Sequence, residues 1–408
     1  MPIDKFTKVL ANELKELEEK GTAKGKELII TKVKKPSGEK GPRFFLKGFG
    51  EKEFIRMNSN SYLGMALRDD VIKIEEKAAE EYGVGPGAVR FINGTYKPHR
   101  DLEKRLAKFH GREDAMIYSA AYTTVIGVLS SLISKETIVI SDELNHNCII
   151  NAIRLSRPLE KHIYKHLDME GLEEQLKNSI GKGKRVIVVT DGIFSMRGDY
   201  APLDKISEIV KKYDKHFEEN IITVVDDSHG VGAFGKTGRG TEEYTNAKEI
   251  DILIGTLGKA YGVNGGYITS NKTITRYLRE KAITYVYSNP ITVAEAATAL
   301  YVIDFLDSKK GKKRLEYLRE LTKRFESGLK NLGLEIIESD HPIVPLLVRD
   351  TKKTAEIVKH LLENGVLATG LNYPVVPRGD EEIRFQINAD HTSYDIDFVL
   401  NVIKKYKG

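Results

Sequence analysis

Residues 221–229 read Ile-Ile-Thr-Val-Val-Asp-Asp-Ser-His, a run of β-branched side chains that ends in a cluster of polar ones. Such a run predicts a buried strand. Two similar strands are predicted at residues 185–190, directly before Asp191, and at residues 250–254, directly before Gly255-Thr256-Leu257-Gly258-Lys259. Open α/β sheets bind ligands at the carboxyl ends of their strands, so these polar residues are candidates for a common site.

The pattern around this stretch alternates strands with helices. A further strand is predicted at residues 137–141, and an amphipathic helix at residues 203–213. This alternation is typical of βα units that build a largely parallel sheet. Long helices and short strands then follow, at residues 294–306, 313–332, 343–348 and 383–387. We therefore predict an α/β protein with an arm (residues 1–60), a large domain (residues 61–292) and a smaller α+β domain (residues 293–408).

Composition excludes several classes of protein. The 408 residues include 64 Lys and Arg and 59 Asp and Glu, and the net charge of +5 is not gathered into a basic tract, so we expect no nucleic-acid partner. The single cysteine, Cys148, cannot form an internal disulfide, which favours a reducing cytoplasm. The longest uncharged run, residues 115–134, contains several hydroxyl side chains, and we interpret it as buried α/β core with no membrane role.

Lys259 and Asp226 suggest a specific chemistry. A lysine beyond a Gly-rich strand end can be desolvated, which lowers its pKa and favours imine formation with an aldehyde. An acid at the neighbouring strand end can pair with a protonated pyridine nitrogen. Together the two residues describe a pyridoxal 5'-phosphate site. No metal is expected, because the ten histidines form no metal-binding array.

A dinucleotide-binding loop is the competing interpretation. Residues 230–235 read Gly-Val-Gly-Ala-Phe-Gly and match the pattern G-x-G-x-x-G. However, Asp-Asp-Ser-His stands between the strand and these glycines, and no helical period follows them. Without a helix start the loop has no site for a pyrophosphate, so we disfavour this interpretation.

Six motifs follow one another along the chain: Asn60-Ser61-Tyr62-Leu63-Gly64, and residues 89–95, 141–146, 190–196, 225–229 and 255–260. In this order they resemble the α-oxoamine synthase family of fold-type I pyridoxal phosphate enzymes, over about residues 5 to 400. The resemblance implies an aspartate aminotransferase-like fold, pyridoxal 5'-phosphate as cofactor, an amino acid and an acyl-CoA as substrates, and a homodimer with shared active sites.

Residues 90–95 and 373–379 are most similar to the glycine C-acetyltransferase (2-amino-3-ketobutyrate CoA ligase) branch. That branch joins glycine to acetyl-CoA to give 2-amino-3-oxobutyrate, and it runs in reverse in threonine catabolism. The alternatives within the family are 8-amino-7-oxononanoate synthase, which uses alanine and pimeloyl-CoA, 5-aminolevulinate synthase and serine palmitoyltransferase. Two further alternatives are an aminotransferase on the same fold and an inactive scaffold subunit, and Lys259 argues against the scaffold.

The resemblance also implies roles for individual residues. Lys259 would hold the cofactor as an imine and then act as the base at the α-carbon. Asp226 would pair with the ring nitrogen, His229 would bind the ring hydroxyl oxygen, and His146 would stack on the ring. The remaining assignments are Ser195 close to the ring, Ala120, Ala121, Tyr122 and Thr256 at the phosphate, Ser288 at the phosphate from the partner subunit, and Arg384 with Asn60 at the substrate carboxylate.

Three features depart from the family pattern. Arg197 stands where an acidic residue usually follows Ser-Met, Ala120 and Ala121 lack side-chain donors, and Pro290 interrupts the segment after Ser288. These departures leave the choice of acyl-CoA open.

Overall fold

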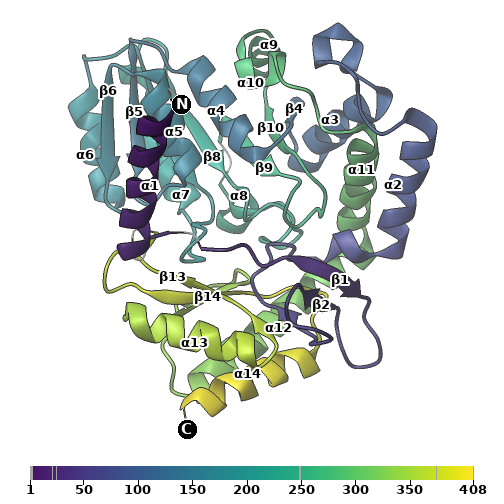
Figure 1. The fold of residues 1–408 in the computed structure, drawn as a ribbon. Coiled ribbons are helices and arrows are strands. Elements are labelled where there is room, and N and C mark those ends of the chain that lie inside the picture. The colour runs from purple at the N-terminus through teal and green to yellow at the C-terminus, as the bar shows by residue number, and fades with distance from the viewer. Residues whose placement is uncertain (1–2, 21, 24, 248–249, 374, 408) are drawn as a thin grey trace.

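A seven-stranded sheet lies at the centre of the molecule, in the order β4-β10-β9-β8-β7-β5-β6 (Figure 1). The computed structural model describes residues 3–20, 22–23, 25–247, 250–373 and 375–407. The strands are β4 (Asp114–Tyr118), β5 (Thr137–Asp142), β6 (Glu160–Tyr164), β7 (Arg185–Asp191), β8 (Ile221–Asp226), β9 (Ile252–Thr256) and β10 (Gly266–Ser270). Strands β6, β5, β7, β8 and β9 are parallel, and only β10 runs antiparallel to its neighbours β9 and β4.

Both faces of this sheet are buried, because successive side chains of a strand point to opposite faces. In β7, Ile187 and Val189 pack in a cluster with α4 (Ala121–Leu132) and α5 (Asn147–Ser156). Val186 and Val188 pack instead in a cluster with α6 (Met169–Ser179) and α7 (Leu203–Tyr213). The β-branched runs in the sequence are therefore explained by helices on both sides of the sheet.

A smaller α+β layer follows and lies below the large sheet in Figure 1. Its sheet has the order β11-β14-β13. The elements are β11 (Ile343–Leu347), β13 (Thr369–Leu371), β14 (Glu382–Gln386), α12 (Lys309–Asn331), α13 (Thr351–Glu363) and α14 (Ser393–Lys407). Between the layers, α11 (Val293–Asp307) packs on α2 (Asp69–Tyr82) and α3 (Lys97–His110).

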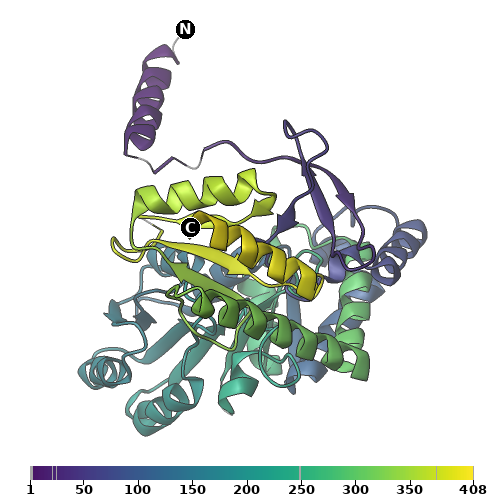
Figure 2. The ribbon, with the colours of Figure 1, turned by 90° about the horizontal axis from the view of Figure 1, so that it is seen from below.

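The N-terminal segment reaches the small layer as well. Helix α1 (Asp4–Glu19) projects away from the body of the protein (Figure 2), and none of its residues is buried. Strand β1 (Ile30–Lys34) pairs with β2 (Arg43–Leu46), and β3 (Ile55–Arg56) pairs with β12 (Val366–Leu367) of the small layer.

The predicted α/β fold is confirmed, including the exact bounds of α7. Three strands of this sheet, β4, β6 and β10, were not predicted. Strand β10 has no β-branched run long enough to stand out, and it runs antiparallel to its neighbours β9 and β4. The uncharged run at residues 115–134 supplies most of β4 and all of α4.

In the described part of the chain, no helix has both the length and the apolar character needed to cross a bilayer. The division at residues 60 and 292 stays a prediction.

A buried ion pair joins the N-terminal segment to the last helix. Arg43 donates to Asp395 Oδ1 at 2.6 Å, and their side chains are only 7% and 0% exposed. Asp395 Oδ2 also accepts from the backbone N–H groups of Gly41, at 2.9 Å, and Thr392, at 3.0 Å. Asp395 thus neutralises the buried cation of β2 and accepts a hydrogen bond at the start of α14, where it lies in the first turn.

We expect Asp395→Asn to lower the free energy of unfolding by about 3 to 5 kcal/mol, because it leaves the Arg43 guanidinium buried without a countercharge. Chemical denaturation followed by circular dichroism measures this change. The control is Asp397→Asn, which breaks an exposed pair with Arg324 and is expected to cost at most about 1 kcal/mol. Equal effects of the two changes would contradict the prediction.

Candidate active site

The carboxyl ends of β7, β8 and β9 meet at one pocket. In the parallel register of β7 and β8, Asp191 lies directly beside Asp226. A cavity of about 360 Å³ opens at this point. Its walls contain seven of the predicted site residues, Ala121, Tyr122, His146, Ser195, Asp226, His229 and Lys259. The structure therefore brings together residues that are up to 138 positions apart, from Ala121 to Lys259.

Lys259 lies just beyond β9, with its amine in this pocket. Burial of the amine lowers the pKa of Lys259 to about 8, although Asp226 attracts the charged form. The positive charge of Arg384 lowers it further. A substantial fraction of the amine is therefore neutral and nucleophilic near neutral pH.

Asp226 is buried and held in place by its neighbour Ser228. The Ser228 hydroxyl donates to Asp226 Oδ1 at 2.6 Å, and the Ser228 backbone N–H donates to the same oxygen at 3.1 Å. Burial, together with the charge of Asp226, raises the pKa of the adjacent Asp191 well above its usual range. The neutral form of Asp191 is thereby favoured, and the charge of Asp226 has the larger influence on Lys259.

Two histidines line the pocket. His146 begins α5, and its backbone N–H donates to Asp191 Oδ2 at 2.9 Å. Burial lowers the pKa of His146 despite the attraction of Asp226. His229 Nδ1 lies 2.7 Å from the Tyr62 hydroxyl, and burial also lowers the pKa of His229. Both imidazoles are therefore favoured in their neutral forms.

The start of α4 forms one end of the pocket. Ala120 is the N-cap and supplies no side-chain acceptor, so the first N–H groups of the helix are free to bind an anion. Gly266 of β10 makes this arrangement possible, because a Cβ there would lie 2.7 Å from the Ala121 nitrogen. Thr256 lies at the end of β9, where its hydroxyl accepts from the Gly258 N–H at 3.1 Å and does not line the pocket.

Arg384 and Asn60 lie together, as the motifs predict. The Arg384 guanidinium donates to Asn60 Oδ1 at 3.2 Å, while its Nε is buried and has no hydrogen-bond partner among the residues that the structure describes. The Tyr62 hydroxyl connects the pair to His229, since it also lies 3.4 Å from Asn60 Oδ1. A guanidinium with an unused buried N–H fits a substrate carboxylate. Ser288 is half-buried and does not line the pocket of its own chain.

Motif reasoning assigned no role to four residues of the pocket wall, Cys148, Asp191, Ile193 and Ser228. Asp191 had a signal, because it ends a predicted strand next to the strand that ends in Asp226. No feature of the sequence pointed to Cys148. Its thiol lies 2.9 Å from His146 Nδ1 and 3.7 Å from Asp226 Oδ2 because α5 begins at the pocket, and this placement depends on the fold.

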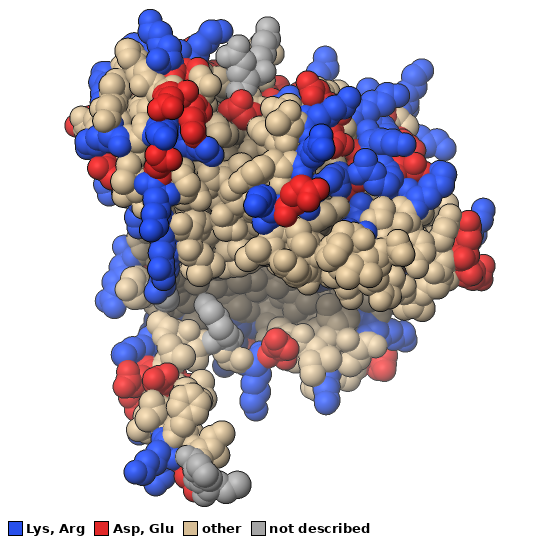
Figure 3. Space-filling model, turned by 90° about the horizontal axis from the view of Figure 1, so that it is seen from above, with Lys and Arg blue, Asp and Glu red and all other residues tan. Residues whose placement is uncertain are grey.

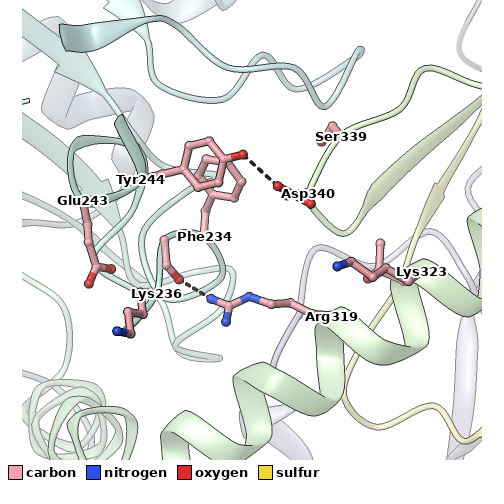
Figure 4. Close-up of a pocket in the computed structure, with 10 residues that line it drawn as sticks. Phe234, Lys236, Glu243, Tyr244, Arg319, Lys323, Ser339 and Asp340 are labelled. Carbon is pink, nitrogen blue, oxygen red and sulfur yellow. Dashed lines mark hydrogen bonds between the residues drawn. The ribbon is translucent and has the colours of Figure 1, made fainter. Parts of the chain in front are cut away.

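A second cavity, of about 840 Å³, lies elsewhere and contains none of the predicted site residues. Figure 4 shows that it lies between the loop around Phe234 and the helix α12. Two of its side chains make contacts between the layers: Tyr244 donates to Asp340 at 2.7 Å, and Arg319 donates to the Gly235 carbonyl. This cavity marks the junction of the two layers and is not the reaction site.

The donor groups of the active-site pocket fit pyridoxal 5'-phosphate. The Lys259 amine suits the aldehyde, the Asp226 carboxylate suits the ring nitrogen, and the uncapped start of α4 suits the phosphate. A family model described as aminotransferase class I and II matches residues 52–403. The fold and the pocket therefore define a pyridoxal phosphate enzyme of fold type I.

Comparison with known proteins shows to which family within this class the chain belongs. The 8-amino-7-oxononanoate synthase of Petrotoga mobilis is 38% identical over 402 residues, which cover 98% of each chain. Mitochondrial 2-amino-3-ketobutyrate coenzyme A ligase of Bos taurus is 36% identical over 95% of this chain and 89% of its own. The solved structure of Sphingomonas wittichii serine palmitoyltransferase has a TM-score of 0.88 and 27% identity, over 99% of this chain and 97% of that one. The chain belongs to the α-oxoamine synthase family, and its cofactor is pyridoxal 5'-phosphate.

We expect borohydride reduction of the cofactor-loaded protein to leave the cofactor attached to Lys259. The rate at which the apoprotein captures the cofactor should rise with pH through about 8, the pKa of this amine, because the neutral amine is the nucleophile. Absorbance follows the capture, and peptide mass spectrometry locates the label. Lys281, an exposed lysine, provides the control variant Lys281→Ala. A label on any residue other than Lys259 would refute the assignment.

Proposed function

We propose that the protein is an 8-amino-7-oxononanoate synthase, which condenses alanine with pimeloyl-CoA. The observation that carries the proposal is the match over 98% of both chains to the Petrotoga mobilis synthase. In this reaction the α-carbon of alanine attacks the thioester carbonyl and coenzyme A leaves. Because the product has one carbon fewer than alanine and the pimeloyl chain together, the carboxyl carbon of alanine leaves as carbon dioxide.

The pocket residues supply the steps that this chemistry needs. When bound, pyridoxal 5'-phosphate withdraws electrons from the α-carbon of the amino acid. The Asp226 carboxylate would hold a proton on the ring nitrogen, and the neutral Lys259 amine would accept the α-proton at Nζ. Arg384 would bind the amino-acid carboxylate through its free Nε, with Asn60 fixing the guanidinium.

Glycine C-acetyltransferase is the second candidate. Residues 90–95 and 373–379 favour that branch, and the bovine ligase is nearly as similar to this chain as the Petrotoga synthase. Relatives that carry the synthase name reach 40% identity, however, against 36% for the ligase. We therefore place alanine and pimeloyl-CoA ahead of the glycine and acetyl-CoA expected from the two motifs.

A substrate panel tests the proposal. Alanine, glycine and serine are each combined with pimeloyl-CoA, acetyl-CoA, succinyl-CoA and palmitoyl-CoA, and thiol release and product mass are measured. We expect alanine with pimeloyl-CoA to give the highest kcat/KM, exceeding every other pair by about tenfold or more. Contacts between a substrate and its pocket can produce a discrimination of this size. A higher kcat/KM for glycine with acetyl-CoA would establish the second candidate instead.

We also propose a cytoplasmic homodimer whose partner copy supplies Ser288. Two neighbouring segments, η2 (Arg90–Gly94) and α10 (Ile283–Val286), lie beside exposed apolar side chains. Phe91 of η2 is 65% exposed, and Tyr287, which follows α10 and precedes Ser288, is 76% exposed. Exposed apolar patches of this kind mark interfaces. Figure 3 shows charges of both signs around a broad uncharged area on one face of the protein.

Mixing Lys259→Ala and Ser288→Ala subunits tests the shared site. If Ser288 acts across the interface, each mixed dimer has one intact site, and the mixture is expected to reach about a quarter of the wild-type activity. Re-equilibrated mixtures are assayed against each variant alone. Activity no higher than the average of the two variants would contradict the shared site.

A further inference from the structure

A cavity of about 500 Å³ adjoins the active-site pocket, and Ser195 lines both. It lies between the turn after β7 and the segment that precedes β14. Its apolar walls are Leu144, Phe194, Met196, Val375, Val376 and Pro377. A flexible hydrocarbon chain that starts at the reacting centre can therefore continue past Ser195 into an apolar space.

Arg197 lines this cavity and has unused hydrogen-bond donors. Its Nε donates to Asp199 Oδ2 at 2.9 Å, and among the described residues its terminal amino groups have no hydrogen-bond partner. His166 Nε2 lies 3.2 Å from the same Asp199 oxygen. Burial alone would lower the pKa of His166, but hydrogen bonds to Asp142 and Asp199 raise it to about 9. Asp199 is therefore paired with His166 as well as with Arg197. The terminal amino groups of Arg197 stay available to bind a ligand in the cavity.

Glu382 also lines the cavity. It is 2% exposed, and its Oε1 has no hydrogen-bond partner within the described part of the chain. Burial raises the pKa of Glu382 to about 8, although Arg384 and Arg197 attract its anion. Near neutral pH most of this carboxyl group is protonated and acts as a hydrogen-bond donor. The third ionisable group, Asp380, lies at the more open side, with Arg349 at 3.9 Å.

We propose that this cavity is the acyl subsite, and that Arg197 and Glu382 select thioesters whose acyl chain ends in a carboxylate. The apolar walls suit the methylene groups of such a chain, and the two donors suit its anionic end. A simple hydrocarbon end would leave both donors unpaired and desolvated, which is unfavourable.

The inference rests on the proposed function and assigns the residues that would select its dicarboxylic acyl group. Its test compares pimeloyl-CoA with heptanoyl-CoA, which has the same chain length without the terminal carboxylate. Binding to the cofactor-loaded protein is measured by titration calorimetry without an amino acid, so no turnover is required. The variants are Arg197→Met, Arg197→Asp and the control Arg324→Met, which removes an arginine that also pairs with an aspartate but lies on α12.

We expect the wild type to bind pimeloyl-CoA about 10- to 100-fold more tightly than heptanoyl-CoA, as for a charged hydrogen bond. Arg197→Met should remove this preference by weakening pimeloyl-CoA alone, Arg197→Asp should reverse it, and Arg324→Met should leave it unchanged. Equal affinities in the wild type, or equal losses for both thioesters in Arg197→Met, would overturn the inference.

The experiments distinguish a failure of the acyl subsite from a failure of the proposed function. If pimeloyl-CoA binds in an Arg197-dependent manner but is not turned over with alanine, the acyl subsite stands and the proposed function fails. If alanine and pimeloyl-CoA react well while Arg197→Met keeps the preference over heptanoyl-CoA, the proposed function stands and the acyl subsite is wrong.

Discussion

The attraction between the Lys259 amine and the Asp226 carboxylate, both withdrawn from water, is the interaction on which the site depends. Burial alone would make the lysine a weak base, and the neighbouring carboxylate limits that shift, so that the pKa settles at about 8. Burial and the adjacent charge favour the neutral form of Asp191. One lysine and one carboxylate thus remain, and we propose that they serve opposite ends of the cofactor ring.

The fold maintains this arrangement by burying both faces of the sheet. Parallel strands bring Asp191 and Asp226 side by side, and helices on each face exclude water from their neighbours. The antiparallel strand β10 contributes to the pocket in another way. Gly266 lets this strand approach the start of α4, where a phosphate fits. The small layer then contributes Arg384 from β14, which donates to Asn60 where the two layers meet, and this is where we propose that the substrate carboxylate binds.

Much of this could be predicted from the sequence, because strand ends and their polar residues are local features. The β-branched runs before Asp191, Asp226 and Gly255 gave the parallel core, and Lys259 with Asp226 indicated the cofactor before any resemblance was considered. The role of β10 and the proximity of Cys148 to Asp226 were not accessible, since both depend on contacts between distant elements. The neighbours of Arg197 were hidden for the same reason: Glu382 lies in another layer, nearly two hundred positions away in the chain.

The most direct test of the central interaction is the protonation state of the cofactor's ring nitrogen. Protein loaded with pyridoxal 5'-phosphate labelled with ¹⁵N in the ring is measured by NMR near neutral pH. We expect a pyridinium chemical shift in the wild type and in the control Asp397→Asn, and an unprotonated pyridine shift in Asp226→Asn. An unprotonated ring nitrogen in the wild type would contradict the role of Asp226, and with it the link between the buried strand ends and the chemistry.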